Sequence, residues 1–205
     1  LDAERFWRMT RGGKLSLVIA GIEAARAAGF EGIKLNAVIV RGENDQELEA
    51  LVRWCWERQI TPRLLEVMQI GEGAKMKDRV VTGAQMRAQL ADLLEADEAV
   101  PEPDRGPAKY VRARHDPSKR VGFITGSSDT YCAGCDRLRV ASNGTLRPCL
   151  ATNDGVDAGD EARRGDEHGI AQAVARAWAQ KPDGQVWKGC TEAEAATLSI
   201  RSIGG

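Results

Sequence analysis

The sequence predicts an α/β protein with a parallel sheet, and three observations lead to this fold class. Apolar residues recur at helical spacing through residues 14–28. A mostly apolar, β-branched run follows at 33–40, as in a buried strand. The alternation then repeats, and the order helix, strand, helix, strand, helix implies crossover helices on a parallel sheet. With 205 residues, the chain has room for one large domain or one and a half.

The first elements have clear end signals. Gly29 follows the first helix where a C-cap glycine belongs. Asn44 and Glu47 form the pattern of a capping box, so we expect a second helix to begin there and to run to about Gln59. The buried stripe of this helix is predicted to hold Leu48, Leu51, Val52 and Cys55.

A second strand and a third helix follow. Pro62 opens the strand, which we expect at 63–70. Thr82 with Gln85 is another capping box, which predicts the start of the third helix. The buried face of that helix is predicted to hold Met86, Leu90, Leu93 and Leu94.

The pattern changes after residue 98. Three prolines make 98–107 a linker or an irregular connection. Two strands are expected at 110–114 and 120–125, joined through 115–118. A helix is expected at 170–180, with Val174 and Trp178 on one face.

Composition and charge exclude several classes of protein. Lys plus Arg number 29 and Asp plus Glu 30, and this balance favours neither nucleic acid nor an anionic membrane as partner. The longest apolar runs, 17–20 and 37–40, are far shorter than the roughly 20 residues of a membrane-spanning helix. The chain begins at Leu1 with no signal-peptide pattern, so we expect a cytoplasmic protein and a piece of a longer chain. Five cysteines, an odd number, argue against a secreted disulfide scaffold.

Three of the cysteines are predicted to meet on a hairpin. Cys132 and Cys135 form a CxxC pattern, and Cys149 follows after Asn143-Gly144, a strong hairpin signal. With those two residues as the turn, the predicted pairs are Ser142 with Thr145, Val140 with Arg147, and Leu138 with Cys149. The three thiolates then converge without long-range folding.

The same hairpin places two cations beside the thiolates. Because residues i and i+2 share one face of a strand, Arg137 and Arg139 are expected on one side, with Leu138 and Val140 on the other. Two guanidiniums beside three thiolates are suited to an anionic ligand such as a phosphate.

The spacing of the three cysteines does not determine which metal they bind. Three thiolates fit a [4Fe–4S] cluster that keeps one iron free for substrate, and they equally fit zinc with a fourth ligand elsewhere. Candidates for that fourth ligand are Cys190, His115 and His168. A structural zinc module with four cysteines is therefore the main alternative. Three buried or accidental cysteines without a metal are a further alternative, which the agreement of spacing, turn and arginine pair disfavours.

Together these residues resemble a known family. Cys132-x-x-Cys135-Asp136-Arg137-x-Arg139, then Cys149 and a terminal Gly204-Gly205, resembles the C-terminal half of the GTP 3′,8-cyclases, also called molybdenum cofactor biosynthesis protein A. These are radical S-adenosylmethionine enzymes of the first step of molybdenum cofactor biosynthesis. Segments 33–38 and 63–68 look like the fifth and sixth strands of the family, so the resemblance covers most of the chain.

The resemblance implies a fold and a reaction. It implies a partial (β/α) TIM-like barrel, with its C-terminal strands and helices in 1–100, and a C-terminal region with the hairpin and the iron–sulfur site in 101–205. In the family, a cluster on a CxxxCxxC motif cleaves S-adenosylmethionine to a radical that abstracts the 3′ hydrogen of GTP. The ribose carbon then bonds to C8 of the base, giving (8S)-3′,8-cyclo-7,8-dihydroguanosine 5′-triphosphate.

The resemblance also implies residue roles, carried onto matching positions. The second [4Fe–4S] cluster would have Cys132, Cys135 and Cys149 as ligands and an open iron for guanine. GTP would be contacted by Lys34, Arg137, Leu138 and Arg139. Met68 would line the S-adenosylmethionine site, and Gly204 and Gly205 would reach into the active site. The partners implied are GTP and, by pathway, a cyclic pyranopterin monophosphate synthase, and a homodimer is left open.

One departure limits what this segment does alone. It contains no CxxxCxxC, so we expect it to hold its own cluster but not to catalyse the cyclisation. Another radical S-adenosylmethionine enzyme with an auxiliary cluster is a further alternative. Among the remaining candidates, Cys55 fits a core position, while Arg63 and Glu66 are expected to pair with each other or to line the barrel mouth.

Overall fold

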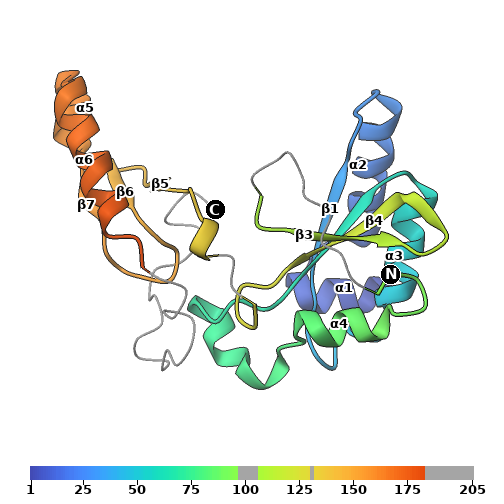
Figure 1. Cartoon of the computed structure of the whole chain (residues 1–205). Helices are drawn as coiled ribbons and strands as arrows, with labels where there is room; N and C mark the ends of the chain where they lie inside the picture. The colour runs from blue at the N-terminus through green and yellow to red at the C-terminus, as the bar shows by residue number, and fades with distance from the viewer. Residues whose placement is uncertain (97–105, 130–131, 183–205) are drawn as a thin grey trace. The chain divides into compact units, whose positions relative to one another are not determined.

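The computed structural model describes residues 1–96, 106–129 and 132–182 (Figure 1). By its contacts the chain divides into two compact units, which are described separately below. Unit 1 comprises 1–67 and 78–128, and unit 2 comprises 68–77 and everything from 129 onward. The expected boundary after residue 100 is not where these units divide, because two strands beyond it complete the sheet of unit 1.

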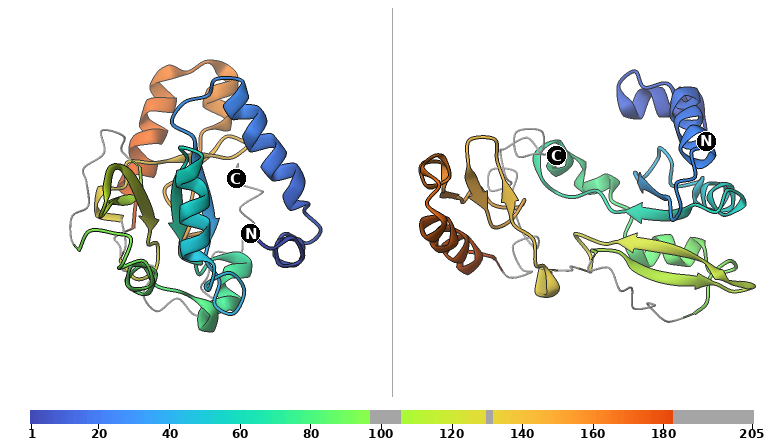
Figure 2. Two further views of the ribbon diagram at one scale, coloured as in Figure 1. Left: turned by 90° about the vertical axis from the view of Figure 1, so that its right-hand side faces the viewer. Right: turned by 90° about the horizontal axis from the view of Figure 1, so that it is seen from above.

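Unit 1 is built on a four-stranded mixed sheet in the order β1-β2-β4-β3. The parallel pairs β1 with β2 and β2 with β4 confirm the predicted α/β class. β3 and β4 form an antiparallel hairpin, seen on the right of Figure 2. Both strands were predicted, but the connection expected at 115–118 is wrong, because β4 already begins at Asp116. The strands are β1 (Lys34–Val38), β2 (Thr61–Leu65), β3 (Lys109–Ala113) and β4 (Asp116–Ile124).

The described residues of unit 1 contain four helices, and two of them cover the core. They are α1 (Ala3–Thr10), α2 (Leu15–Ala27), α3 (Leu48–Glu57) and α4 (Gly83–Gln89). Gly29 has φ of 82°, which confirms the predicted glycine stop after α2. In the described part of the chain, no helix combines the length and apolar character needed to cross a membrane. The core joins one face of the sheet to α3 and α4 through Val52, Leu64, Met86, Leu90, Val121 and Phe123.

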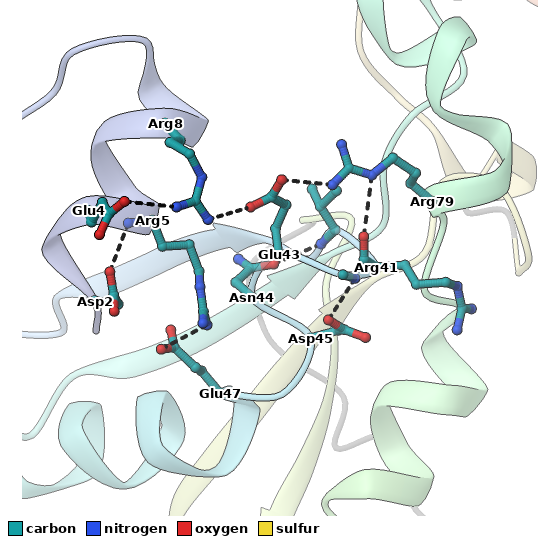
Figure 3. Close-up of polar contacts among 12 residues, drawn as sticks. Asp2, Glu4, Arg5, Arg8, Arg41, Glu43, Asn44, Asp45, Glu47 and Arg79 are labelled. Carbon is teal, nitrogen blue, oxygen red and sulfur yellow. Dashed lines mark hydrogen bonds and ion pairs between the residues drawn. The ribbon is translucent and has the colours of Figure 1, made fainter.

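The capping box predicted at Asn44 is wrong, because this side chain closes the preceding turn instead. Its Oδ1 accepts the Val40 N–H at 2.8 Å and its Nδ2 donates to the Val38 carbonyl at 2.9 Å. α3 begins at Leu48 without a side-chain cap. Figure 3 shows the reason: Glu47, the other half of the expected box, pairs with Arg5 at 2.9 Å.

The second strand is shorter than the expected 63–70, whereas the second capping box is confirmed. β2 ends at Leu65, and the next residue, Glu66, is buried. Thr82 and Gln85 bond reciprocally at the start of α4. Leu90 and Leu94, which follow the last helical turn, are buried as expected.

The described part of unit 2 has a small antiparallel sheet in the order β5-β6-β7 and two α-helices. Its elements are η1 (Gly71–Arg79, which continues into unit 1), η2 (Cys132–Gly134), β5 (Arg139–Val140), β6 (Thr145–Arg147), β7 (Val156–Asp157), α5 (Gly159–Arg164) and α6 (Glu167–Ala179).

The face of α6 predicted to be apolar is not the face that is buried. Ala173 and Ala177 are fully buried against Leu146 and Ala158. Trp178 is 47% exposed, and Val174 is exposed as well. Small alanines let the helix approach the sheet closely, so the best-packed face is the one with the smallest side chains.

Candidate metal centre

The two cysteines of the CxxC pattern lie at the two ends of a tight turn. η2 begins at Cys132, and the Cys135 N–H donates to the Cys132 carbonyl at 3.0 Å. Cys149 follows β6, the second strand of the hairpin, and therefore returns toward this turn. All three thiols are free, as is Cys55 in unit 1.

The hairpin forms at the predicted place, but its register differs by one residue. Val140 lies opposite Leu146 and Arg139 opposite Arg147, so the predicted pairs of Val140 with Arg147, Ser142 with Thr145 and Leu138 with Cys149 are wrong. The turn has three residues, because the Ala141 N–H donates to the Thr145 carbonyl and closes it one residue earlier. Gly144 takes φ of 89°, the left-handed position of such a turn.

The change of register alters what the strand presents on each side. Leu138 packs against the cluster that joins the hairpin to α6. Val140, which was expected on the same side as Leu138, is 64% exposed. Arg137 is exposed and Arg139 half-buried, and both follow directly on the CxxC turn.

Two of the cysteines share an apolar cluster. Cys132 and Cys149 pack with Met68 and Leu150 around the buried side chains of Ile70 and Ala151. Met68, distant in sequence, therefore belongs to the same apolar cluster as two of the predicted ligands. The Ala151 N–H donates to Cys149 Sγ at 3.3 Å, an arrangement that suits a thiolate.

The three thiols differ in electrostatic environment. Burial raises the pKa of Cys149, and the neighbouring thiols of Cys132 and Cys135 raise it further. Burial acts in the same direction on Cys135, but the Arg137 N–H and the charges of Lys181 and Arg137 outweigh it and lower the pKa of this thiol.

A lysine that the sequence did not single out contacts this site. Lys181 Nζ lies 3.5 Å from Cys135 Sγ and donates to the Arg137 carbonyl at 2.8 Å. It also donates to the Pro148 carbonyl at 3.2 Å. Its position just after a helix, in a stretch without periodicity, gave no signal of this role.

The donor set fits thiolate ligation of either an iron–sulfur cluster or zinc. Free thiols, an N–H donor to sulfur and a nearby ammonium suit iron–sulfur ligation. Among residues 1–96, 106–129 and 132–182, no three His, Cys, Asp or Glu side chains form a group that could hold a metal ion, and this includes the three predicted cysteine ligands. Of the suggested fourth zinc ligands, His168 bonds Gln172 at 2.9 Å, and Cys190 lies outside the described residues.

Lys34 lies in unit 1, on the sheet face opposite the core. It is half-buried at the start of β1 and shares its face with Asn36 and Val38, which are exposed. Arg63, opposite Asn36 on β2, donates to Asn36 Oδ1 at 2.8 Å. Glu66 does not pair with Arg63, contrary to one expectation.

Glu66 instead binds three backbone N–H groups and a hydroxyl inside unit 1. The Gly83 N–H donates to it at 2.7 Å, and those of Ser127 and Ser128 at 2.9 Å each. The Ser128 hydroxyl bonds the same carboxylate. This carboxylate therefore joins the end of β2 to the segment that follows β4.

Other features of the chain do not coincide with the predicted site. A cavity of about 420 Å³ opens between α1, α2 and β1, and none of the predicted site residues lines it. Gly204 and Gly205 lie outside the described residues.

Comparison with known proteins identifies relatives for most of the chain. Residues 60–187 match the family described as Molybdenum Cofactor Synthesis C. A GTP 3′,8-cyclase of Pseudomonas putida is 39% identical over 186 residues, covering 89% of this chain and 55% of that protein. GTP 3′,8-cyclase 1 of Pseudomonas aeruginosa is 38% identical over 188 residues, and a GTP 3′,8-cyclase of Rhodopseudomonas palustris 37% over 186. The chain thus spans a little over half the length of these relatives.

Proposed function

Because the chain belongs to the Molybdenum Cofactor Synthesis C family, we propose that it is the cluster-bearing, GTP-binding part of a GTP 3′,8-cyclase. The observation that carries this proposal is the set of three free thiols in unit 2, two of them packed together beside Met68. A radical-generating CxxxCxxC is absent from the 205 residues, so this segment alone is proposed to be inactive.

The cysteines are proposed to hold a [4Fe–4S] cluster. Cys132, Cys135 and Cys149 would each supply one thiolate, and such a cluster offers an open iron to a nitrogen of the guanine base. The Ala151 N–H and the ammonium of Lys181 stabilise negative charge on these sulfurs. Apolar side chains pack beside Cys132 and Cys149, which are both partly buried.

The cations near the cysteines are proposed to bind the triphosphate. Arg137 and Arg139 follow the CxxC turn, and planar guanidiniums bind phosphate oxygens in pairs. Leu138 between them packs inward and fixes the strand that carries both. Lys34 is proposed to contribute a further charge from β1.

The remaining assignments complete the proposal for the whole enzyme. The α/β sheet of unit 1 is proposed to be the last part of a partial (β/α) barrel in the cytoplasm. Met68 is proposed to line the site of S-adenosylmethionine, and Gly204 and Gly205 to enter the active site. A second [4Fe–4S] cluster would belong to the part of the enzyme with the CxxxCxxC. By pathway, a cyclic pyranopterin monophosphate synthase would act next, and a homodimer is a further proposal.

Anaerobic metal and sulfide analysis tests the proposed cluster. After reconstitution, the chain is expected to hold about four iron and four sulfide, and Cys149→Ala to lose most of both. Cys55→Ala is the matched control, because Cys55 is a buried core thiol in unit 1. One zinc per chain without sulfide would refute the cluster and favour a structural zinc module.

GTP binding by the reconstituted chain tests the proposed cations. Loss of a charge-assisted hydrogen bond costs about 1.5–3 kcal/mol, so Arg137→Ala and Arg139→Ala are each expected to weaken GTP binding about 10- to 100-fold in equilibrium dialysis. Arg164→Ala, an exposed arginine of α5, is the control and should bind GTP like the parent. Equal binding by all three variants would contradict the assignment.

A further inference from the structure

The side chain of Lys181 contacts the cysteine site through three hydrogen bonds. Its ammonium has three N–H donors, and the structure gives it three acceptors. These are Cys135 Sγ at 3.5 Å, the Arg137 carbonyl at 2.8 Å and the Pro148 carbonyl at 3.2 Å. None of the three is a carboxylate, so ordinary charge pairing does not explain this placement.

The acceptors come from both arms of the hairpin. Arg137 precedes β5, and Pro148 follows β6 immediately before Cys149. The hairpin itself pairs only Arg139 with Arg147 and Val140 with Leu146 between these strands. The lysine therefore joins the two arms beyond the last described pair, at the end where the cysteines lie.

The backbone of Lys181 is held by α6. Its N–H donates to the Trp178 carbonyl at 3.1 Å, and its ammonium lies 5.3 Å from the centroid of the Trp178 ring. α6 is anchored to the hairpin by the buried alanines Ala173 and Ala177. The ammonium is thus delivered to the cysteines from an element that packs on the same hairpin.

We infer that Lys181 is a positioning residue for the metal centre: it joins the two hairpin arms and donates a hydrogen bond to the Cys135 ligand. This inference rests on the proposed function for the nature of the centre. That Lys181 joins the two arms of the hairpin is independent of the proposed function. An N–H donor to a ligating sulfur stabilises its negative charge, and it raises the reduction potential of a cluster that gains an electron.

The test compares Lys181→Met, Lys181→Arg and the parent chain after anaerobic reconstitution with iron and sulfide. Lys75→Met is the matched control, because Lys75 makes an exposed ion pair with Glu72 in the same unit. Cluster loss to a chelator is followed by absorbance, and the reduction potential by redox titration monitored by electron paramagnetic resonance. Hydrogen exchange of the Ala141 amide, which closes the hairpin turn, is measured in the metal-free chains.

Lys181→Met is expected to lose its cluster about 10- to 100-fold faster than the parent, the usual effect of removing a partner of a metal ligand. Its reduction potential should fall, its Ala141 amide should exchange faster, and Lys181→Arg should restore part of each. Parent-like cluster loss, potential and exchange in Lys181→Met would overturn the inference. A parent chain that binds no cluster would refute the proposed function, and the exchange of Ala141 alone would then decide whether Lys181 braces the hairpin.

Discussion

Glu66 shows how a single buried charge can organise several segments. Its carboxylate is 1% exposed and accepts from the N–H groups of Gly83, Ser127 and Ser128. Glu66 and Ser128 lie within one residue of a point where the chain passes between the two units, and Gly83 lies five residues after another such point. A carboxylate can satisfy all of these donors because it has about four acceptor positions.

Removing this acceptor should therefore destabilise unit 1. A buried donor left without an acceptor costs about 1–3 kcal/mol of stability. Glu66→Ala leaves several such donors, so its free energy of unfolding should fall by several times this amount. Glu66→Gln should lose less, because its amide oxygen still accepts. Urea unfolding followed by circular dichroism measures the loss. Glu72→Ala, an exposed carboxylate, should stay within about 0.5 kcal/mol of the parent. A Glu66→Ala midpoint equal to that of Glu72→Ala would contradict the role given to Glu66.

Cys55 should behave differently from the cysteines of the hairpin. Burial raises its pKa to about 12, so the native thiol stays protonated at pH 8. We expect maleimide labelling of the native, metal-free chain to modify Cys135 and to leave Cys55 unmodified, as peptide mass spectrometry can show. Labelling of Cys55 at the rate of Cys135 would contradict the buried position.

The same raised pKa has a consequence for stability. An unfolded cysteine loses its proton near pH 8.5 and the buried one only near 12, so between these values the folded state binds more protons. The contribution of Cys55 to stability is therefore complete below about pH 8.5 and falls as the pH rises. Urea unfolding from pH 8 to pH 10 measures how far the free energy of unfolding falls with pH. This fall should be smaller in Cys55→Ala than in the parent, and an equal fall would contradict the raised pKa of Cys55.

At the scale of elements, the sequence predicted local patterns well where no competing partner was near. The Thr82 capping box formed because both partners lie within one turn. The Asn44 box did not form, because Glu47 pairs with Arg5 of a helix distant in sequence and Asn44 accepts a hydrogen bond from the backbone of its own turn. Such competitors are brought close only by the tertiary fold, and no local pattern contains them.

The hairpin illustrates the same limit on a finer level. Asn143-Gly144 correctly predicted the turn, but not whether it has two or three residues. The structure closes it at Ala141 and Thr145, with Gly144 against Gly159 of α5. An added Cβ on Gly144 would lie 2.5 Å from the Gly159 Cα, so the contact with α5 helps to fix this form of the turn.

Gly144→Ala should therefore destabilise the chain by more than the strain of an alanine in a left-handed backbone conformation. Gly165 is the matched control, because it has φ of 68° and no heavy atom within 4 Å of an added Cβ. Both substitutions carry a backbone cost of about 1–2 kcal/mol. Only Gly144→Ala adds the clash with Gly159, for about 1–3 kcal/mol more. Thermal unfolding of the two variants measures the difference, and equal losses would contradict the close packing.

At the scale of the molecule, the candidate site was predictable as far as it is local. The cysteines and arginines of the hairpin lie within 18 residues, so spacing alone grouped them. Met68 was assigned only through resemblance, and Lys181 was missed, because each reaches the cysteines through the fold of unit 2. Lys34 belongs to unit 1, and its role in GTP binding stays a prediction.

This division into units predicts where metal binding will stabilise the chain. All three proposed ligands and Lys181 belong to unit 2, whereas the core around Phe123 belongs to unit 1. A ligand that binds only the folded state adds RT ln(1 + [L]/Kd) to the stability of the region that must fold to bind it. Hydrogen exchange should therefore slow on cluster loading for amides of β5, β6 and α6, and change little for β1 and β2. Chelation of the iron should reverse the effect. Equal protection of β1 and β2 would show that the two units unfold together, because protection can spread from the ligands only through a shared cooperative transition.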